Sequence, residues 1–319
     1  MTVHLPGSSV ATSQVGLGSA PLSAGWGRPH SIRLVHAACA AGIRHFDTAP
    51  PYGMGTAEEV LGQALEQRRH QVTIATKVGL ARPRHAALVI TARNLAAPLR
   101  RIAPKLTRRA GASAYHGLRS RPPLTPKFIR ESLCTSLRLL RTDYVDLLLL
   151  HEAAPDDLTD VVLRTIDDLR KEGKALSLGT GTSFASTLAI RAQHPQFFDV
   201  YQYSWSLLEA RPEEPAAFTV THGSIHNALA RVREWLREKP ERLRGLSDAT
   251  GIDLSNDDEL GYALLGAALA HNPEGITLVS SRQQNRVEGS ARLLRERSMV
   301  DAGVRLMTAL CGQPEGMAL

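Results

Sequence analysis

The chain has 319 residues, of which 43% are hydrophobic and 22% charged, a composition typical of a globular protein with a sizeable core. Its net charge of +7 does not indicate nucleic-acid binding by the whole fold, because the positive excess lies in one stretch. Residues 81–130 hold twelve basic side chains and no Asp or Glu, which leaves 26 basic residues against 31 acidic ones elsewhere. We therefore expect a mildly acidic globule with one basic segment and no nucleic-acid partner.

The same sequence gives no indication of a membrane or metal protein. The first ten residues lack the basic start and apolar stretch of a signal peptide. The longest apolar runs are far shorter than the roughly 20 residues that cross a bilayer. Cys39, Cys134 and Cys311 have neither metal nor redox spacing. We expect a soluble, cytoplasmic protein with reduced thiols, no metal site and no membrane contact; the sequence does not indicate an oligomeric state.

A short apolar run, a turn with Gly or Ser, and an amphipathic helix recur along the chain. Most of the runs are continuously apolar, as in strands whose sheet is covered on both faces. The predicted strands, in chain order, are Gln14–Gly18, Gly42–Asp47, Val72–Lys77, Tyr144–His151, Ala175–Thr180, Asp199–Tyr203, Ala216–Thr221 and Gly275–Ser280. The predicted helices are Ser31–Ala41, Thr56–Gln67, Pro126–Arg141, Leu158–Glu172, Ser183–Gln193, Ile225–Arg237, Asp257–His271 and Gln283–Arg297.

This alternation predicts an α/β fold, a (β/α)8 TIM barrel that forms a single domain over residues 1–319. A doubly wound open sheet is the competing fold, and it predicts a Gly-x-Gly-x-x-Gly turn after the first strand. The turn here begins with Gly16 and Gly18 but lacks the third glycine. Two stretches exceed a minimal barrel: a basic insertion over residues 80–124 after the third strand, with a short helix near Ala92–Ile102, and a polar connection at Glu238–Asn256.

Polar side chains stand at the ends of three predicted strands. Asp47 ends the second strand and Tyr52 follows it, Lys77 ends the third strand, and His151 ends the fourth. In a closed barrel these carboxyl ends share one mouth. A phenol has an ordinary pKa of about 10, and a lysine ammonium nearby favours the phenolate and makes the phenol a better acid. A desolvated lysine needs a carboxylate to hold its charge, and a neutral imidazole can donate to a carbonyl oxygen.

At these positions the sequence closely resembles the aldo-keto reductase family. The matching segments are GIRHFDTAPPYGMGTAEEVLGQAL, TIATKVG and SLRLLRTDYVDLLLLHE. The resemblance covers nearly the whole chain apart from the insertion. It implies an NADPH-dependent enzyme that reduces an aldehyde or ketone, or a sugar-like substrate, with Tyr52 as proton donor supported by Asp47, Lys77 and His151.

The resemblance also implies a cofactor site. Ser183 and Gln202 match positions that bind the nicotinamide carboxamide, although many relatives have Asn at the first. Thr221 or His222 occupies the place of the group that stacks on the ring. The last strand leads through serines into a helix N-terminus, which is a phosphate site on physical grounds, and two arginines there favour NADP(H) over NAD(H). The candidate cofactor-binding residues are Gly18, Asp47, Ser183, Gln202, Thr221, His222, Ser280, Ser281, Arg282, Arg286 and Ser290.

The basic insertion leaves an alternative open. It could be a solvated loop, or it could shape a pocket for a bulky or acidic substrate. In a third hypothesis, the chain is an NADPH-binding barrel that acts mainly as a partner- or anion-binding protein through this segment. A pure binding protein has no physical need for a buried lysine beside a tyrosine, so the tetrad favours the enzyme.

Overall fold

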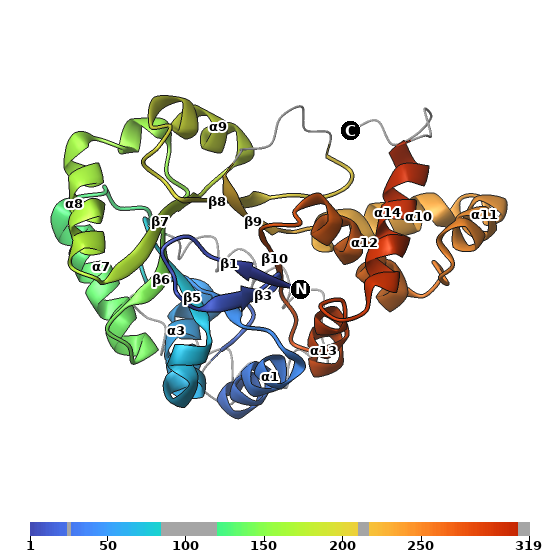
Figure 1. Cartoon of the computed structure of the whole chain (residues 1–319), viewed down its shortest axis with the longest axis horizontal. Helices are drawn as coiled ribbons and strands as arrows, with labels where there is room; N and C mark the ends of the chain where they lie inside the picture. The colour runs from blue at the N-terminus through green and yellow to red at the C-terminus, as the bar shows by residue number, and fades with distance from the viewer. Residues whose placement is uncertain (24–26, 84–119, 210–216, 312–319) are drawn as a thin grey trace, which may run out of the picture.

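Eight parallel strands close into a barrel with helices packed around it (Figure 1). The structure is a computed structural model that describes residues 1–23, 27–83, 120–209 and 217–311. The strands follow one another around the barrel in chain order, and the last pairs with the first. They are β3 (Val15–Gly18), β4 (His45–Asp47), β5 (Thr73–Val78), β6 (Val145–His151), β7 (Ala175–Gly181), β8 (Val200–Ser204), β9 (Phe218–His222) and β10 (Ile276–Val279). The predicted (β/α)8 barrel is confirmed.

Each predicted helix outside residues 80–124 has a counterpart in the structure. The helices are α1 (Arg28–Ala41), α2 (Tyr52–Gly55), α3 (Ala57–Leu65), α7 (Pro126–Leu140), α8 (Asp160–Lys171), α9 (Phe184–Gln193), α10 (His226–Arg237), α11 (Pro240–Thr250), α12 (Asp257–His271), α13 (Gln284–Arg292) and α14 (Arg297–Cys311). Short 3-10 turns cover Glu66–Gln71 and Pro155–Asp157. Helix α7 has the predicted proline in its first turn and buries Ile129, Leu133, Leu137 and Leu140 along one face.

Two sequence predictions about the last third of the chain are wrong. The polar connection at Glu238–Asn256 contains α11, which begins at Pro240 and ends against the left-handed Gly251. The helix predicted over Gln283–Arg297 stops at Arg292, and a separate helix, α14, begins at Arg297. The predicted insertion at residues 80–124 lies mostly outside the described residues, as does its short helix, so both stay predictions.

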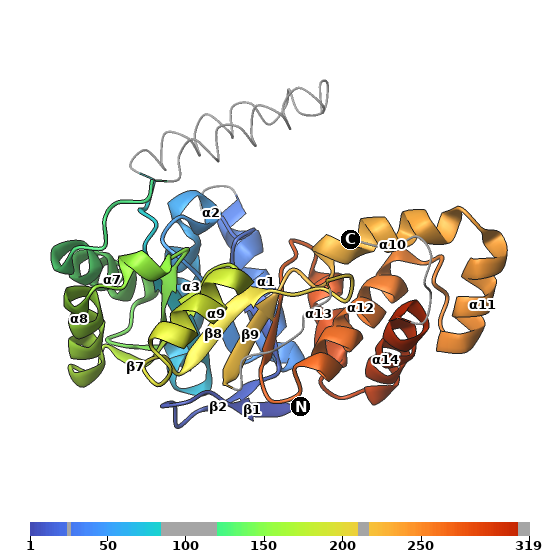
Figure 2. The same cartoon turned by 90° about the horizontal axis from the view of Figure 1, so that it is seen from above.

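A hairpin closes one end of the barrel. A two-stranded hairpin of β1 (Thr2–His4) and β2 (Ala11–Ser13) lies across the end opposite the strands' carboxyl ends (Figure 2). Val3 and Leu5 of this hairpin region join the apolar cluster inside the barrel, which includes Leu147 and Leu149 of β6. The open mouth is therefore at the carboxyl ends of the strands.

A buried polar cluster lies in the barrel above this hairpin. The His45 ring is 2.9 Å from the Thr73 hydroxyl, which lies 2.7 Å from the hydroxyl of Thr12. Asp146 accepts a hydrogen bond from the backbone N–H of Ile74 at 2.9 Å. His45 is fully buried, and this burial lowers its pKa from 6.5 to about 4 against the opposing effect of nearby carboxylates. A neutral imidazole is thus part of the folded core.

The C-terminal helices form a lobe beside the barrel. Helices α10, α11, α12 and α14 enclose a second apolar cluster that includes Val232, Trp235 and Leu306 (Figures 1 and 2). Helix α12 belongs to both clusters: Leu264 faces the lobe, and Leu265 and Leu269 face the barrel. Helix α12 thus packs against both the barrel and the lobe, and the single domain stays a prediction. Within the described ranges, none of the helices has the length and apolar character to span a bilayer.

Candidate active site

The four candidate catalytic residues meet at the mouth of the barrel. The Lys77 Nζ donates to Asp47 Oδ2 at 2.5 Å and to the carbonyl oxygen of Thr48 at 3.1 Å. The same nitrogen lies 5.2 Å from the centre of the Tyr52 ring. The rings of Tyr52 and His151 are 5.9 Å apart and nearly perpendicular, at 87°. Sequence order had separated these side chains by up to about a hundred residues, and the parallel strands bring them together.

The barrel desolvates the lysine. Lys77 is 1% exposed and Asp47 is 2% exposed, so the ion pair is taken almost entirely out of water. Burial lowers the pKa of Lys77, and the carboxylate of Asp47 opposes that shift by its charge and its hydrogen bond. Asp47 therefore favours the protonated form of Lys77 next to the Tyr52 ring, whereas a buried lysine without a carboxylate would tend to lose its proton.

An unusual turn aims the Tyr52 side chain. Tyr52 is followed by three residues with positive φ, namely Gly53 at 58°, Met54 at 61° and Gly55 at 88°. A Cβ added at Gly53 would lie 2.0 Å from the carbonyl oxygen of Leu22, so a larger residue does not fit there. Left-handed backbone is costly for Met54 and persists only where the surroundings enforce it.

Contacts made by Glu58 and the partly exposed Arg82 hold this turn in place. Glu58, which is fully buried at the start of α3, accepts from the Thr76 hydroxyl at 2.6 Å and pairs with Arg82. Arg82 also donates to the carbonyl oxygen of Gly55. At the start of α3 the Thr56 hydroxyl donates back to the carbonyl oxygen of Gly53 at 2.7 Å and does not cap the helix. The turn is thus bound to the end of β5, which carries Lys77.

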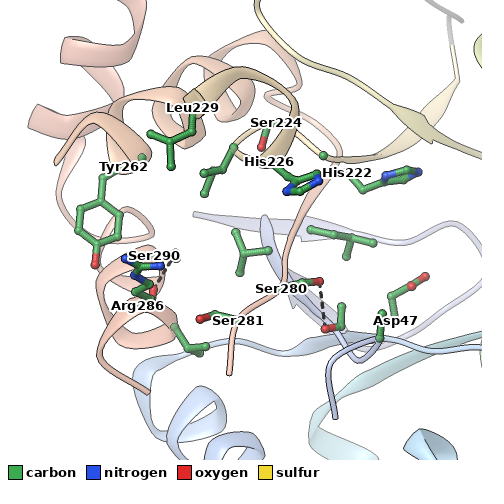
Figure 3. A pocket seen from close by; sticks show the side chains of 18 of the residues that line it. Asp47, His222, Ser224, His226, Leu229, Tyr262, Ser280, Ser281, Arg286 and Ser290 are labelled. Carbon is green, nitrogen blue, oxygen red and sulfur yellow. Dashed lines mark hydrogen bonds between the residues drawn. The ribbon is translucent and has the colours of Figure 1, made fainter. Parts of the chain in front are cut away.

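A cleft of about 480 Å³ extends from these residues toward the C-terminal lobe (Figure 3). Asp47 lies at one end, and Tyr262 and Arg286 lie at the other (Figure 3). Eight of the candidate cofactor-binding residues line the cleft: Gly18, Asp47, Gln202, His222, Ser280, Ser281, Arg286 and Ser290.

Near the barrel mouth the cleft is lined by Gln202, Gly18 and Ser280. The Gln202 Nε2 donates to Asp47 Oδ2 at 2.8 Å, which leaves its carbonyl oxygen as an acceptor. The Ser280 hydroxyl donates to the carbonyl oxygen of Gly18 at 3.1 Å (Figure 3). A Cβ at Gly18 would come within 2.4 Å of that hydroxyl, so a larger residue there would displace the Ser280 side chain.

Three candidate residues do not line the cleft. The Ser183 hydroxyl caps α9 by accepting from the N–H of Ser186 at 3.1 Å. Thr221 is buried, and its hydroxyl lies 3.1 Å from that of Thr277 inside the barrel, while the next residue, His222, faces the cleft. Arg282 is exposed on the surface. Of the two alternatives at the end of β9, the structure places His222 in the cleft.

The lobe supplies a wall that the sequence analysis missed. Ser224 and His226, at the start of α10, and Asp257, Asp258 and Tyr262, on α12, all line the cleft. The Ser224 hydroxyl is buried and has no hydrogen-bond partner in the described part of the chain. The only sequence signals were a Gly-Ser turn before a helix and an acidic first turn, which are equally typical of ordinary helix starts.

Comparison with known proteins decides the family. The sequence profile described as "Aldo/keto reductase family" matches residues 14–225. The chain belongs to the aldo/keto reductase family. The match covers β3 to β9 with all four candidate catalytic residues and ends before the helices of the C-terminal lobe.

Individual members of the aldo/keto reductase family are related at low identity. An uncharacterized oxidoreductase of Bacillus subtilis (strain 168) is 26% identical over 207 residues, 65% of this chain and 56% of the relative. The NADH-specific methylglyoxal reductase of Escherichia coli (strain K12) is 26% identical over 221 residues, 66% and 60% of the two chains. A D-threo-aldose 1-dehydrogenase from a Pseudomonas species is 32% identical over 209 residues, 61% and 56%. The chain thus spans somewhat more than half the length of these relatives.

Solved aldo-keto reductase structures share the fold over almost the whole chain. The holo form of an aldo-keto reductase from Bacillus halodurans aligns with a TM-score of 0.68 at 21% identity, covering 94% of both chains. An aldo-keto reductase from Klebsiella pneumoniae in complex with NADPH aligns with a TM-score of 0.68 at 19% identity, covering 99% of this chain and 97% of that one. The likeness at this identity concerns the fold.

Proposed function

We propose that this aldo/keto reductase is an oxidoreductase that uses NADPH to reduce an aldehyde or ketone to an alcohol, reversibly, and accepts NADH less well. The observation that carries the proposal is the buried ion pair of Lys77 and Asp47 beneath the ring of Tyr52. Two buried charges cost several kcal/mol each in desolvation, and a protein core of this kind has no structural need for them. A proton-transfer site does need them.

Tyr52 is the proposed general acid. In the reducing direction its hydroxyl donates a proton to the carbonyl oxygen of the substrate, and the cation of Lys77 stabilises the phenolate that is left. Asp47 stabilises that cation, and its hydrogen bond from Gln202 fixes the orientation of the carboxylate. In the oxidising direction the phenolate accepts the proton back.

His151 is proposed to bind the substrate. His151 is 6% exposed and its ring packs edge-on against Tyr52, so it faces the same reacting group. A neutral imidazole donates one hydrogen bond, and donated to the carbonyl oxygen this bond would orient the substrate and polarise it. Tyr52 and His151 together define the point where the oxygen of the substrate lies.

The cleft fits a dinucleotide. The reduced nicotinamide supplies the hydride when it is bound. The Nε2 of Gln202 donates to Asp47, which leaves its carbonyl oxygen to accept from a carboxamide, and Gly18 and Ser280 line the same part of the cleft. The buried hydroxyl of Ser224, for which the described residues supply no hydrogen-bond partner, can donate to a diphosphate. Arg286 and Ser290 stand at the far end for the adenosine part.

We propose a small carbonyl or sugar-like compound as substrate and the cytoplasm as the location. Two of the relatives are named for methylglyoxal and for an aldose, which are small carbonyl compounds. A role in binding a partner or anion through residues 80–124 is the competing hypothesis; it predicts NADPH binding without turnover.

Replacing Tyr52 by phenylalanine tests the proposed function. The Tyr52→Phe variant keeps the ring but loses the proton, so reduction of a nitrobenzaldehyde should fall by a factor of about a hundred to ten thousand. The affinity for NADPH, measured by fluorescence titration, should stay within about twofold. A wild type that binds NADPH but turns over no member of a broad carbonyl panel would favour the binding protein, and retained turnover in the variant would refute Tyr52 as the acid.

A further inference from the structure

The far end of the cleft holds an ion pair between two helices. The Nε of Arg286, on α13, lies 3.0 Å from Oδ1 of Asp258, on α12. Both residues line the cleft, and their side chains are 49% and 42% exposed. The arginine that the sequence analysis assigned to a phosphate is therefore already paired with a carboxylate of the same protein.

The neighbouring acid is differently engaged. Asp257 also lines the cleft, but its carboxylate pairs with Arg233 of α10 at 2.7 Å. Glu259, the third acid of this turn, accepts from the backbone N–H of Asp253 and does not line the cleft. Asp258 is thus the carboxylate whose charge directly faces Arg286.

We infer that Asp258 sets the cofactor specificity of the site by competing with the 2′-phosphate of NADP(H) for Arg286. A phosphate that approaches the guanidinium must break the existing pair and then face the charge of the displaced carboxylate. The 2′-hydroxyl of NAD(H) needs neither step, and a carboxylate accepts hydrogen bonds from hydroxyl donors. Asp258 therefore reduces the preference for NADPH that Arg286 would otherwise give. The inference rests on the proposed function, because it assumes that a nicotinamide dinucleotide occupies the cleft.

The test is a binding titration with purified wild type and the Asp258→Asn variant. NADPH and NADH are titrated separately, and binding is followed by calorimetry, which needs no turnover. Asparagine keeps the size of the side chain and removes its charge. The variant loses both the ion pair with Arg286 and the repulsion between Asp258 and the 2′-phosphate. The dissociation constant of NADPH should therefore fall by about tenfold, which corresponds to about 1.4 kcal/mol of binding free energy. NADH should bind equally well or up to about threefold more weakly.

A matched control separates this effect from the loss of a charge in general. Glu259→Gln removes the same charge from the same turn of α12, where an acid also favours the helix N-terminus. It should leave the ratio of the two dissociation constants within about twofold of the wild type. Unfolding temperatures of the three proteins verify that each is folded.

The outcomes are distinguishable. A shift of the NADPH-to-NADH ratio in Asp258→Asn that is absent in Glu259→Gln supports the inference. An unchanged ratio in Asp258→Asn, or an equal shift in both variants, overturns it while the proposed function stands. A wild type that binds neither dinucleotide overturns the proposed function and the inference together.

Discussion

Replacing His45 by glutamine perturbs the buried polar cluster of the barrel without touching the mouth. The imidazole is fully buried, bonds to the Thr73 hydroxyl at 2.9 Å, and stays neutral because burial lowers its pKa to about 4. Glutamine is similar in length and can bond to the same hydroxyl, but it does not titrate. The variant therefore removes a single proton-binding group from the folded core.

The magnitude follows from the two pKa values of His45. Between pH 6.5, the ordinary value, and pH 4, the unfolded chain binds a proton at this position and the folded chain does not. Acidification therefore favours the unfolded chain, and stability rises with pH across this window. The gap between the two values corresponds to about 3 kcal/mol of unfolding free energy, fully present above pH 6.5 and lost as the pH falls toward 4.

The assay is urea unfolding followed by tryptophan fluorescence at pH 7.5 and pH 4.5. At pH 7.5 the wild type should be the more stable protein, because glutamine packs less well in the cluster. At pH 4.5 its advantage over His45→Gln should have shrunk by about 2 to 3 kcal/mol. His70→Gln, which removes an exposed imidazole, is the control and should follow the wild type. A constant difference between wild type and His45→Gln at both pH values would refute the reasoning.

Two further predictions concern the site. Arg286→Ala should weaken the binding of NADPH by at least about tenfold and that of NADH by less than about threefold, because a guanidinium is the natural partner of the extra phosphate. Equal losses of affinity in titrations with the two dinucleotides would mean that the 2′-phosphate lies elsewhere. Gly53→Ala should lower the unfolding free energy by about 2 kcal/mol or more and reduce kcat, since the new Cβ would meet the carbonyl oxygen of Leu22 in a left-handed turn. Wild-type stability in urea together with wild-type turnover would contradict that account of the turn.

The grouping of the candidate catalytic residues at one mouth could be predicted from the sequence because its signals are local. Asp47 and His151 end runs of buried strand residues and Lys77 is the last but one residue of such a run, and parallel strands in a closed barrel place these ends at one mouth. The apolar runs form strands that are buried along their whole length, as β6 is, so the positions of the strands could be predicted to within a few residues.

The far end of the cleft, proposed for the adenosine part of the cofactor, could not be predicted in the same way. Its outer wall comes from helices of the lobe, and helix composition does not say which face will turn toward a strand end. Helix α11 was missed because it is polar; it buries only Leu246 and Thr250 and is held to α14 by Arg305, which donates to the carbonyl oxygen of Thr250. The pairing of Arg286 with Asp258 joins helices separated by β10, and such a contact has no signature in the sequence.

The sequence also left open which of two adjacent residues at the end of β9 faces the cleft. Successive strand residues face opposite sides, so shifting the end by one residue exchanges the side chain that faces the cleft. Thr221 faces the barrel interior and His222 faces the cleft. The sequence left both alternatives open because neither side chain is aromatic in the manner of tyrosine or phenylalanine, and only the register with β8 and β10 distinguishes them.

The central claim is that the cation of Lys77 makes Tyr52 a usable acid, and the pH dependence of the reduction rate in Lys77→Met tests it most directly. In single turnovers with NADPH already bound, the alkaline fall in the wild-type rate reports loss of the proton from the acid. Removing the cation should lower the plateau by about a hundredfold or more and move this fall to higher pH. A lowered plateau with the alkaline fall unmoved would contradict the account.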